Sequence, residues 1–397
     1  MRDIGLIEDG CVAITDQHIV AAGSTDDVMA SVVVHDHCRV IDASGRVVTP
    51  GLIDPHTHPI YAGNRAGEFE MRIEGKSYEE IAAAGGGIRA SVRMTRDAGL
   101  DELSSAARRR LDRMLAHGTT TVEAKSGYGL SAESELRQLQ AIKQLNSEHP
   151  IDLVPTFLGA HEIPDEYQGR REEYIELVCN EMIPAVAKDR LAVFSDVFCD
   201  RGVYTNDESA YIQSAAAGHG LALKFHADEL ATTGGAELAA EMNAVSADHL
   251  IRISDDGLKA LQQSRTMAVL LPGTSFSLGA HKFAPGRRMI DEGVAVALAT
   301  DCNAGSCNTE SLQMAAALAA QYFRFTAAEC WTAMTANAAW ALLKAHRIGS
   351  LAPGFQADLV IWDMEDYREL PYHFGVNLVD TLVKNGRVVN GKDKVSP

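Results

Sequence analysis

The feature that most constrains the fold of this chain is a regular alternation of short apolar segments with amphipathic helical segments. The apolar segments are short enough to be buried strands. Eight of them are predicted to be strands, at 51–56, 119–124, 151–158, 193–198, 221–226, 244–248, 267–271 and 294–300. Helices rich in Ala, Leu, Glu and Arg are predicted between most of them, as at 101–116, 132–146, 172–187 and 207–218. This order predicts an α/β fold, a (β/α)8 barrel of the TIM type.

An open, doubly wound sheet is the alternative architecture for the same alternation. It is disfavoured because no G-x-G-x-x-G motif follows any of the predicted strands. The length of 397 residues also suits one large barrel together with a smaller domain.

Both ends of the chain are β-rich, unlike the middle. Short alternating segments at 11–14, 18–22, 31–35 and 39–41 predict small antiparallel strands near the N-terminus. Near the C-terminus, 357–362 and 381–389 are strand-like, and Asn385-Gly386 is a hairpin signal. Since chain ends often lie close in space, we expect 1–48 and 348–397 to form one small β-domain beside a barrel at 49–347.

Composition and charge exclude several classes of protein. The net charge of −18 argues against nucleic acid or an anionic membrane as the main partner. The chain contains no run of 18 or more apolar residues, so no membrane span is predicted. The first ten residues lack the pattern of a signal peptide. Seven cysteines without a pairing pattern fit reduced thiols, so we predict a cytoplasmic protein.

The first predicted barrel strand ends in two histidines that are one residue apart, His56 and His58. Residues i and i+2 of a strand project to the same face. The two imidazoles can therefore offer nitrogen atoms to one metal ion.

Other polar residues follow the later strands, where barrel enzymes carry their active sites. The ends of these strands carry Lys125, His161, His226, His249 and Asp301. Three histidines and one aspartate, namely His56, His58, His226 and Asp301, suit a borderline metal such as Zn²⁺ or Fe²⁺. An open position on such a metal holds a water whose pKa falls toward about 7.

These residues resemble the amidohydrolase superfamily of metal-dependent hydrolases. The resemblance covers nearly the whole chain and rests on G-L-I-D-P-H-T-H at 51–58, on His226, His249 and Asp301, and on I-G-S-L-A-P-G-F-Q-A-D-L-V at 348–360. It implies a barrel with a β-sandwich built from both termini, and it implies His56, His58, His226 and Asp301 as metal ligands. The strand at 193–198 lacks the lysine that binuclear members use as a bridge. The resemblance therefore implies one metal ion per subunit, Zn²⁺ or Fe²⁺.

A second set of motifs is similar to one branch of that superfamily. They are H-T-H-P-I-Y-A-G-N-R at 56–65, Y-E-E-I-A-A-A-G-G-G-I at 78–88, E-A-K-S-G-Y-G-L at 123–130, F-L-G-A-H at 157–161, F-H-A-D-E at 225–229 and D-C-N-A-G-S at 301–306. This branch opens the ring of 4-imidazolone-5-propanoate to N-formimino-L-glutamate in histidine degradation. The resemblance implies the same reaction here, on a small anionic cyclic amide, in a homodimer.

The substrate carries a propionate, which an arginine can bind through two hydrogen bonds. We expect Arg65 to hold it. The residues expected to add hydrogen bonds are Tyr78, Tyr128 and His161, and those expected at the opening end of the substrate are Asn303, Gly305 and Ser306. The glycine run at 85–87 is interpreted either as a flexible loop over the ligand or as a plain turn.

Metal-bound hydroxide is expected to attack the ring carbon of the scissile C–N bond. Asp301 and His249 are placed to manage the protons of the water, and Glu229 to face the ring nitrogens. Which of these three is the first general base stays open. Lys125 has two interpretations, a structural ion pair with a nearby carboxylate or a role toward the substrate.

Two alternative functions remain at this stage. A deaminase of a cyclic amidine such as guanine or cytosine shares the ligands and His249, but Arg65 and the G-Y-G segment favour an anionic substrate. A non-catalytic protein on the same fold typically lacks one or more ligands, and none is missing here.

Overall fold

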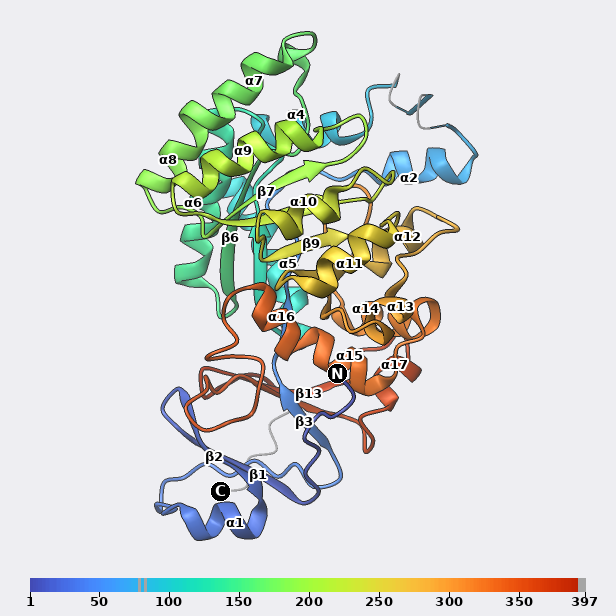
Figure 1. The fold of residues 1–397 in the computed structure, drawn as a ribbon. Helices are drawn as coiled ribbons and strands as arrows, with labels where there is room; N and C mark the ends of the chain where they lie inside the picture. Colours follow the sequence, from blue (N-terminus) through green and yellow to red (C-terminus); the bar gives the residue numbers. More distant parts are fainter. Residues whose placement is uncertain (78–79, 82–83, 392–397) are drawn as a thin grey trace.

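The computed structural model describes residues 1–77, 80–81 and 84–391. Its centre is a sheet of eight parallel strands joined in chain order (Figure 1). The strands are β4 (Leu52–Asp54), β5 (Thr119–Lys125), β6 (Asp152–Ala160), β7 (Phe194–Cys199), β8 (Ala222–Ala227), β9 (Ser246–His249), β10 (Met267–Leu270) and β11 (Val296–Leu298). All eight predicted strands are confirmed, and their ends differ from the predicted ends by at most two residues. The barrel fold is confirmed with them.

The barrel closes where the segments after β4 and β11 meet. The Asp301 amide donates to the His56 carbonyl at 3.1 Å, and the His58 amide donates to the Cys302 carbonyl at 2.9 Å. Just before them, the Thr300 hydroxyl donates to the Asp54 carboxylate at 2.6 Å. The seam between the first and last strands therefore runs through three of the predicted metal ligands.

Helices surround the barrel, and their starts carry recognisable caps. Helix α6 (Ala132–Glu148) begins after Ser131, and α9 (Asn206–Gly218) begins with a capping box of Thr205 and Glu208. Helix α5 (Leu100–Ala116) confirms the prediction for 101–116. The helix predicted at 172–187 is present as α7 (Arg171–Leu177) and α8 (Ile183–Lys188), joined by the π-helical turn η2 (Val178–Met182).

The remaining helical elements are shorter. They are α2 (Ala66–Ile73), α4 (Ile88–Asp97), η1 (Asp165–Tyr167), α10 (Gly235–Glu241), α11 (Asp255–Gln263), α12 (Pro272–Ser277), α13 (Gly286–Asp291), α14 (Leu312–Leu318), η3 (Ala319–Phe323), α15 (Ala327–Met334), α16 (Ala336–Ala341) and α17 (Glu369–Tyr372). None of the helices in the described part of the chain is both long and apolar enough to cross a membrane.

Strands from both chain ends pack together below the barrel (Figure 1). One antiparallel sheet has the order β14-β13-β12-β3, and β1 pairs with β2 in a separate hairpin. Their bounds are β1 (Gly10–Thr15), β2 (His18–Ser24), β3 (Val47–Pro50), β12 (Leu359–Trp362), β13 (Val379–Lys384) and β14 (Arg387–Gly391). Val12 and Ile14 of the hairpin pack on Leu359, Ile361 and Val383 of the sheet. The predicted sandwich of both termini is confirmed, whereas its exact limits stay a prediction.

Two predicted strands near the N-terminus are wrong. Residues 31–35 and 39–41 form no strand, and helix α1 (Thr25–Ser31) precedes them. The Ser24 side chain accepts from the Asp27 amide, and acidic residues in the first turn favour this helix start. Val33 and Val40 are 81% and 65% exposed, and of the residues at 39–41 only Ile41 packs on the terminal sheet, so the apolar alternation there does not mark strands.

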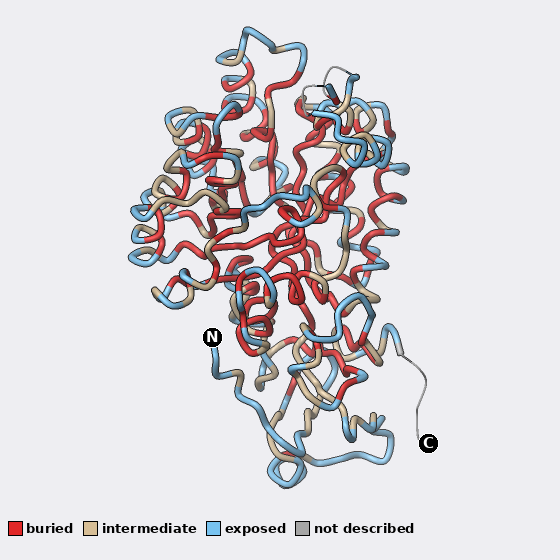
Figure 2. Tube along the Cα trace, turned by 90° about the vertical axis from the view of Figure 1, so that its right-hand side faces the viewer, coloured by how far each residue is buried: buried red, intermediate tan, exposed pale blue. Residues whose placement is uncertain are grey.

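Burial is concentrated in the barrel (Figure 2), whereas much of the segment built by the chain ends is exposed or half-buried. Gly51 joins the two parts, since it lies between β3 and β4. A Cβ atom at this residue would lie 2.3 Å from the Thr120 hydroxyl oxygen. Only glycine therefore lets the chain pass directly from the outer sheet into the barrel.

Candidate active site

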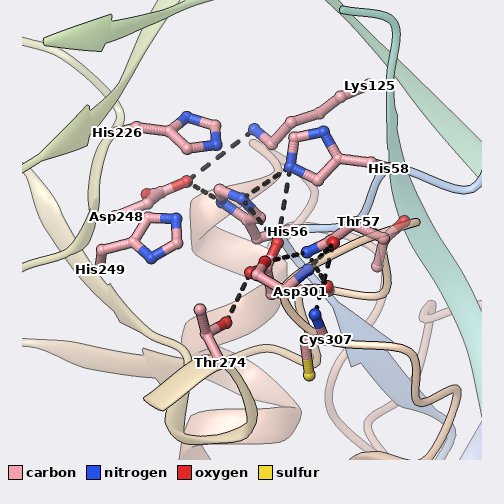
Figure 3. Close-up of polar contacts among 12 residues, drawn as sticks. His56, Thr57, His58, Lys125, His226, Asp248, His249, Thr274, Asp301 and Cys307 are labelled. Carbon is pink, nitrogen blue, oxygen red and sulfur yellow. Dashed lines mark hydrogen bonds and ion pairs between the residues drawn. The ribbon is translucent and has the colours of Figure 1, made fainter. Parts of the chain in front are cut away.

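The four predicted metal ligands converge at the C-terminal mouth of the barrel (Figure 3). The His56 and His58 Nε2 atoms are 3.2 Å apart. An Asp301 Oδ1 atom lies 3.6 Å from each of them. Ligand atoms about 2.1 Å from a tetrahedral metal lie roughly 3.4 Å from one another. These three atoms therefore have the spacing that one ion requires.

His226 belongs to a second group that shares His56. Ligand atoms of His56, His226 and His249 all lie within 4.8 Å of one another, and the rings of His56 and His226 are 4.5 Å apart at their centroids. The structure thus brings together all four predicted ligands and adds His249 beside them. Both nitrogens of His249 lack a hydrogen-bond partner among the described residues. A buried imidazole without a partner is expected beside an ion or a substrate.

Burial prepares these side chains for a cation. It lowers the pKa of His56 and of His58 well below the usual value, and nearby cationic groups add to the effect. Both imidazoles are therefore neutral, the form that binds metal. Burial raises the pKa of Asp301 to about 6, although the Thr274 hydroxyl, 2.5 Å from its Oδ2 atom, opposes the shift. A bound cation would favour the ionised form of this carboxyl.

Two carboxylates lie beside the outer nitrogens of His56 and His226. Asp248 Oδ2 lies 2.6 Å from His56 Nδ1, and Asp196 Oδ2 lies 3.0 Å from His226 Nδ1. For His226, burial lowers the pKa but the Asp196 charge outweighs it, so the pKa is raised. Carboxylate partners of this kind fix the ring orientation and tautomer of ligating histidines. Because Asp248 contacts Nδ1 of His56, the Nε2 atom of this ring is left directed at the centre of the site.

Beneath the histidines lies a layer of buried charges, the charged floor, made of Glu123, Lys125, Asp196, Lys224 and Asp248. The Lys125 ammonium lies 2.6 Å from Asp196 and 2.9 Å from Glu123. The Lys224 ammonium lies 2.9 Å from Glu123 and donates to the Pro55 carbonyl at 2.8 Å. Of the two interpretations of Lys125, the structure therefore supports the ion pair.

Sequence reasoning missed most of the charged floor as part of the site. The sequence did contain a signal for these residues, because residues two apart in a strand point to the same face of the sheet. Lys224 precedes His226 by two residues, and Glu123 precedes Lys125 by two. A charged residue at such a spacing inside an otherwise apolar strand indicates an inward-facing polar site.

His249 and Glu229 face each other beside the ligands, with His249 Nδ1 3.6 Å from Glu229 Oε2. Burial, and then repulsion from Asp301, raises the pKa of Glu229 to about 8. Burial lowers the pKa of His249 well below its usual range. A protonated carboxyl beside a neutral imidazole is a pair suited to proton exchange. The backbone of His249 and Asp301 has φ values of 74° and 55°, a strained conformation typical of functional sites.

Two predicted substrate residues line the site from neighbouring strand ends. The His161 ring stacks on His58 with centroids 5.2 Å apart, and its Nδ1 lies 2.9 Å from the Gly127 carbonyl. Burial, and then the His226 charge, lowers the pKa of His161 to about 3, so the ring is neutral. The Tyr128 ring lies 5.5 Å from that of His161. Both side chains therefore adjoin the metal-ligand candidates.

The segment after Asp301 forms a tight turn around Asn303. The Asn303 side-chain oxygen accepts from the Gly305 and Ser306 amides at 2.8 Å each, and its nitrogen donates to the Ser306 hydroxyl at 2.8 Å. Arg65 lies against this turn, since a Cβ on Gly305 would be 1.9 Å from its guanidinium. The structure thus brings together Arg65, Asn303, Gly305 and Ser306. Tyr78 lies outside the described residues.

The chain is similar to known proteins along its full length. Residues 47–389 match the amidohydrolase family. A protein of Geobacillus kaustophilus named imidazolonepropionase is 50% identical over 396 residues, which cover 100% of this chain and 93% of that protein. Its namesake from Brevibacillus brevis is 49% identical over 397 residues, with the same shares covered.

Solved structures with lower identity share the fold. A 5-methylcytosine deaminase from Klebsiella pneumoniae superposes with a TM-score of 0.75 at 18% identity, covering 96% of this chain and 95% of that one. An adenosine deaminase from Xanthomonas campestris with bound zinc gives a TM-score of 0.67 at 18% identity, covering 98% of this chain and 90% of that one. These matches support the barrel and the sandwich, and at this identity they carry the fold alone.

Proposed function

This chain belongs to the amidohydrolase family, and we propose that it hydrolyses 4-imidazolone-5-propanoate to N-formimino-L-glutamate. The observation that carries the proposal is the 50% identity, over 100% of the chain, to a protein named imidazolonepropionase. Water adds to the ring carbonyl carbon, the ring C–N bond breaks, and the released nitrogen receives a proton. Water is the only co-reactant that this hydrolysis requires, so no oxidant, reductant or organic cofactor is involved.

The family is metal-dependent, and we assign His56, His58, His226 and Asp301 as the residues that hold one divalent ion. The 3.2–3.6 Å spacing of three of their ligand atoms supports this assignment. When bound, the ion supplies Lewis acidity and lowers the pKa of a water toward about 7. Zn²⁺ and Fe²⁺ both accept this donor set, and elemental analysis of protein purified without added metal distinguishes them.

Asp301, His249 and Glu229 are the groups proposed to move protons. The high pKa of Glu229 and the low pKa of His249 support a division in which Glu229 returns a proton to the ring nitrogen and His249 hydrogen-bonds the developing oxyanion. Glu229→Gln keeps the shape of the side chain and removes its titration. Turnover is expected to fall while metal content stays the same, and full activity would remove Glu229 from the proton path.

Substrate binding is assigned to the mouth of the barrel. Arg65 binds the propionate, and Tyr128, His161 and Tyr78 hydrogen-bond the carboxylate or the ring. Asn303, Gly305 and Ser306 bind the end of the substrate that opens. The support is the position of these residues around the histidine cluster, apart from Tyr78, which is proposed from its motif.

The decisive experiment supplies metal-replete protein with freshly generated 4-imidazolone-5-propanoate. Loss of the ultraviolet absorbance of the ring reports turnover, and mass spectrometry identifies the product. Chelator-sensitive loss with formiminoglutamate as product is expected. Turnover of guanine or cytosine, with none of the imidazolone, would replace the proposal with a deaminase.

We further propose a homodimer in the cytoplasm as the working form of the enzyme. Light scattering of the purified protein tests the dimer, and fractionation of the native cell tests the location. A monomer at micromolar concentration with full activity would contradict the first proposal.

A further inference from the structure

Helix α2 follows Arg65 directly and has no buried residue. Its Glu68 nevertheless points inward, with only 15% of the side chain exposed. One Glu68 carboxylate oxygen accepts from the Arg65 Nε at 2.9 Å and from the Gly87 amide at 3.1 Å. A single carboxylate thus joins the arginine to the glycine run at 85–87.

The glycine run is shaped around this carboxylate. A Cβ atom on Gly86 would lie 2.7 Å from the Ile81 Cγ2 atom and 2.9 Å from both the Ile81 carbonyl oxygen and the Glu68 carboxyl carbon, so only glycine fits between these two residues. Gly85 and Gly87 have φ values of 84° and 80°, which favour glycine. The run therefore forms a cradle for Glu68, a role that neither the flexible loop nor the plain turn describes.

The opposite face of Arg65 is bounded by Gly305, where an added Cβ would lie 1.9 Å from one terminal nitrogen. The guanidinium is consequently held between the Glu68 carboxylate and the backbone of the turn after Asp301. Within the described residues, its two terminal nitrogens donate no hydrogen bond. These nitrogens are the pair that a carboxylate ligand would engage.

We propose that Glu68 is a positioning residue that, with Gly305, holds Arg65 in the one orientation that receives the substrate carboxylate. This inference rests on the proposed role of Arg65 and extends it. Glu68 fixes Nε and leaves the terminal nitrogens for the ligand, so the arginine loses little side-chain freedom when the substrate binds. The cradle at 85–87 in turn fixes Glu68.

The test compares Glu68→Ala with Glu70→Gln, an exposed glutamate on the same helix. Binding of 3-(imidazol-4-yl)propanoate and of 4-methylimidazole, which lacks the carboxylate, is measured by calorimetry on metal-loaded protein. Glu68→Ala is expected to weaken the carboxylate ligand by about tenfold, the value of a charge-assisted hydrogen bond, and to leave 4-methylimidazole unchanged. Glu70→Gln is expected to change neither. Equal weakening of both ligands, or of neither, by Glu68→Ala would overturn the proposal.

Gly305→Ala offers a second variant in case Glu68→Ala fails to fold. The three atoms nearest to its Cβ would all belong to the Arg65 guanidinium, so it displaces the arginine from the other side. If both variants act through the orientation of Arg65, the double variant loses no more affinity than the stronger single one. Additive losses of affinity for 3-(imidazol-4-yl)propanoate, with the binding of 4-methylimidazole unchanged in both single variants, would show that Glu68 acts independently of Arg65.

Turnover separates this inference from the proposed function. In Glu68→Ala the KM for 4-imidazolone-5-propanoate is expected to rise by about tenfold with kcat and metal content nearly unchanged. A wild-type protein that does not turn over this compound would refute the proposed function. The pair of binding ligands would still report whether Glu68 positions Arg65.

Discussion

The charged floor and the mouth of the site are built by different means. The floor consists of side chains on strands β5, β7, β8 and β9, all buried and paired with one another. At the mouth, Arg65 and Glu68 come from a loop and an exposed short helix, with 19% and 15% of their side chains exposed. Strand side chains of the floor thus contact the predicted metal ligands, whereas the residues proposed to bind the substrate carboxylate lie on a loop and a short helix.

The largest expected effect lies in the floor. Lys125→Met would remove the lysine paired with buried Asp196 and leave Glu123 with Lys224 alone, and breaking a buried ion pair costs about 3–5 kcal/mol. The free energy of unfolding, measured with urea, is expected to fall by that amount. Lys259→Met serves as the control, because this lysine is 64% exposed beside Asp256 and exposed pairs contribute less than about 1 kcal/mol. An equal fall in the free energy of unfolding in both variants would show that the ion pairs of the floor contribute no more than those of the surface.

A second prediction concerns the contact between the floor and the metal ligands. Asp248→Asn weakens the hold on the His56 Nδ1 atom, and loss of such partners lowers metal affinity by about 10–100-fold. Competition with a chelator is expected to show this loss. Unchanged metal affinity would mean that the strand alone orients His56.

At the mouth, the corresponding change should spare the metal. Arg65→Lys keeps the charge but loses the planar pair of donors, so the KM for the substrate is expected to rise by about tenfold. Metal content and the free energy of unfolding are expected to stay at the wild-type values. Loss of metal from this variant would show that mouth and floor are not separable.

The smallest effect is a pH dependence at Glu229, which lies between the two regions. Burial raises its pKa from the usual 4.5 to about 8, so its contribution to stability is complete below about pH 4.5 and is lost as pH rises through 8. The melting temperature of metal-free protein is expected to decline between about pH 4.5 and 8, and to decline less in Glu229→Gln. Parallel curves for the two proteins would contradict the raised pKa.

Much of the fold and part of the site could be predicted from the sequence. The strands of the barrel have a clear period, and His56 and His58 share a face whatever the register. The carboxylate partners of the histidines could not be predicted, since Asp248 reaches His56 and Asp196 reaches His226 across strands only in the register that the sheet adopts. Segments 31–35 and 39–41 show the opposite failure, because their alternation occurs without a neighbouring strand. The cradle at 85–87 was invisible because it depends on Glu68, seventeen or more residues earlier.

The seam of the barrel has a consequence for how the molecule is assembled. The bond from Thr300 to Asp54 spans 246 residues, so it forms only after the intervening chain has found its place, and closing so long a loop carries a large entropic cost. Two imidazoles lie on one side of the seam and a carboxylate on the other. An ion held across it would act as a clasp on the last step of folding, stabilising the closed ring in proportion to its own affinity. Metal binding at this site would then depend on closure of the barrel.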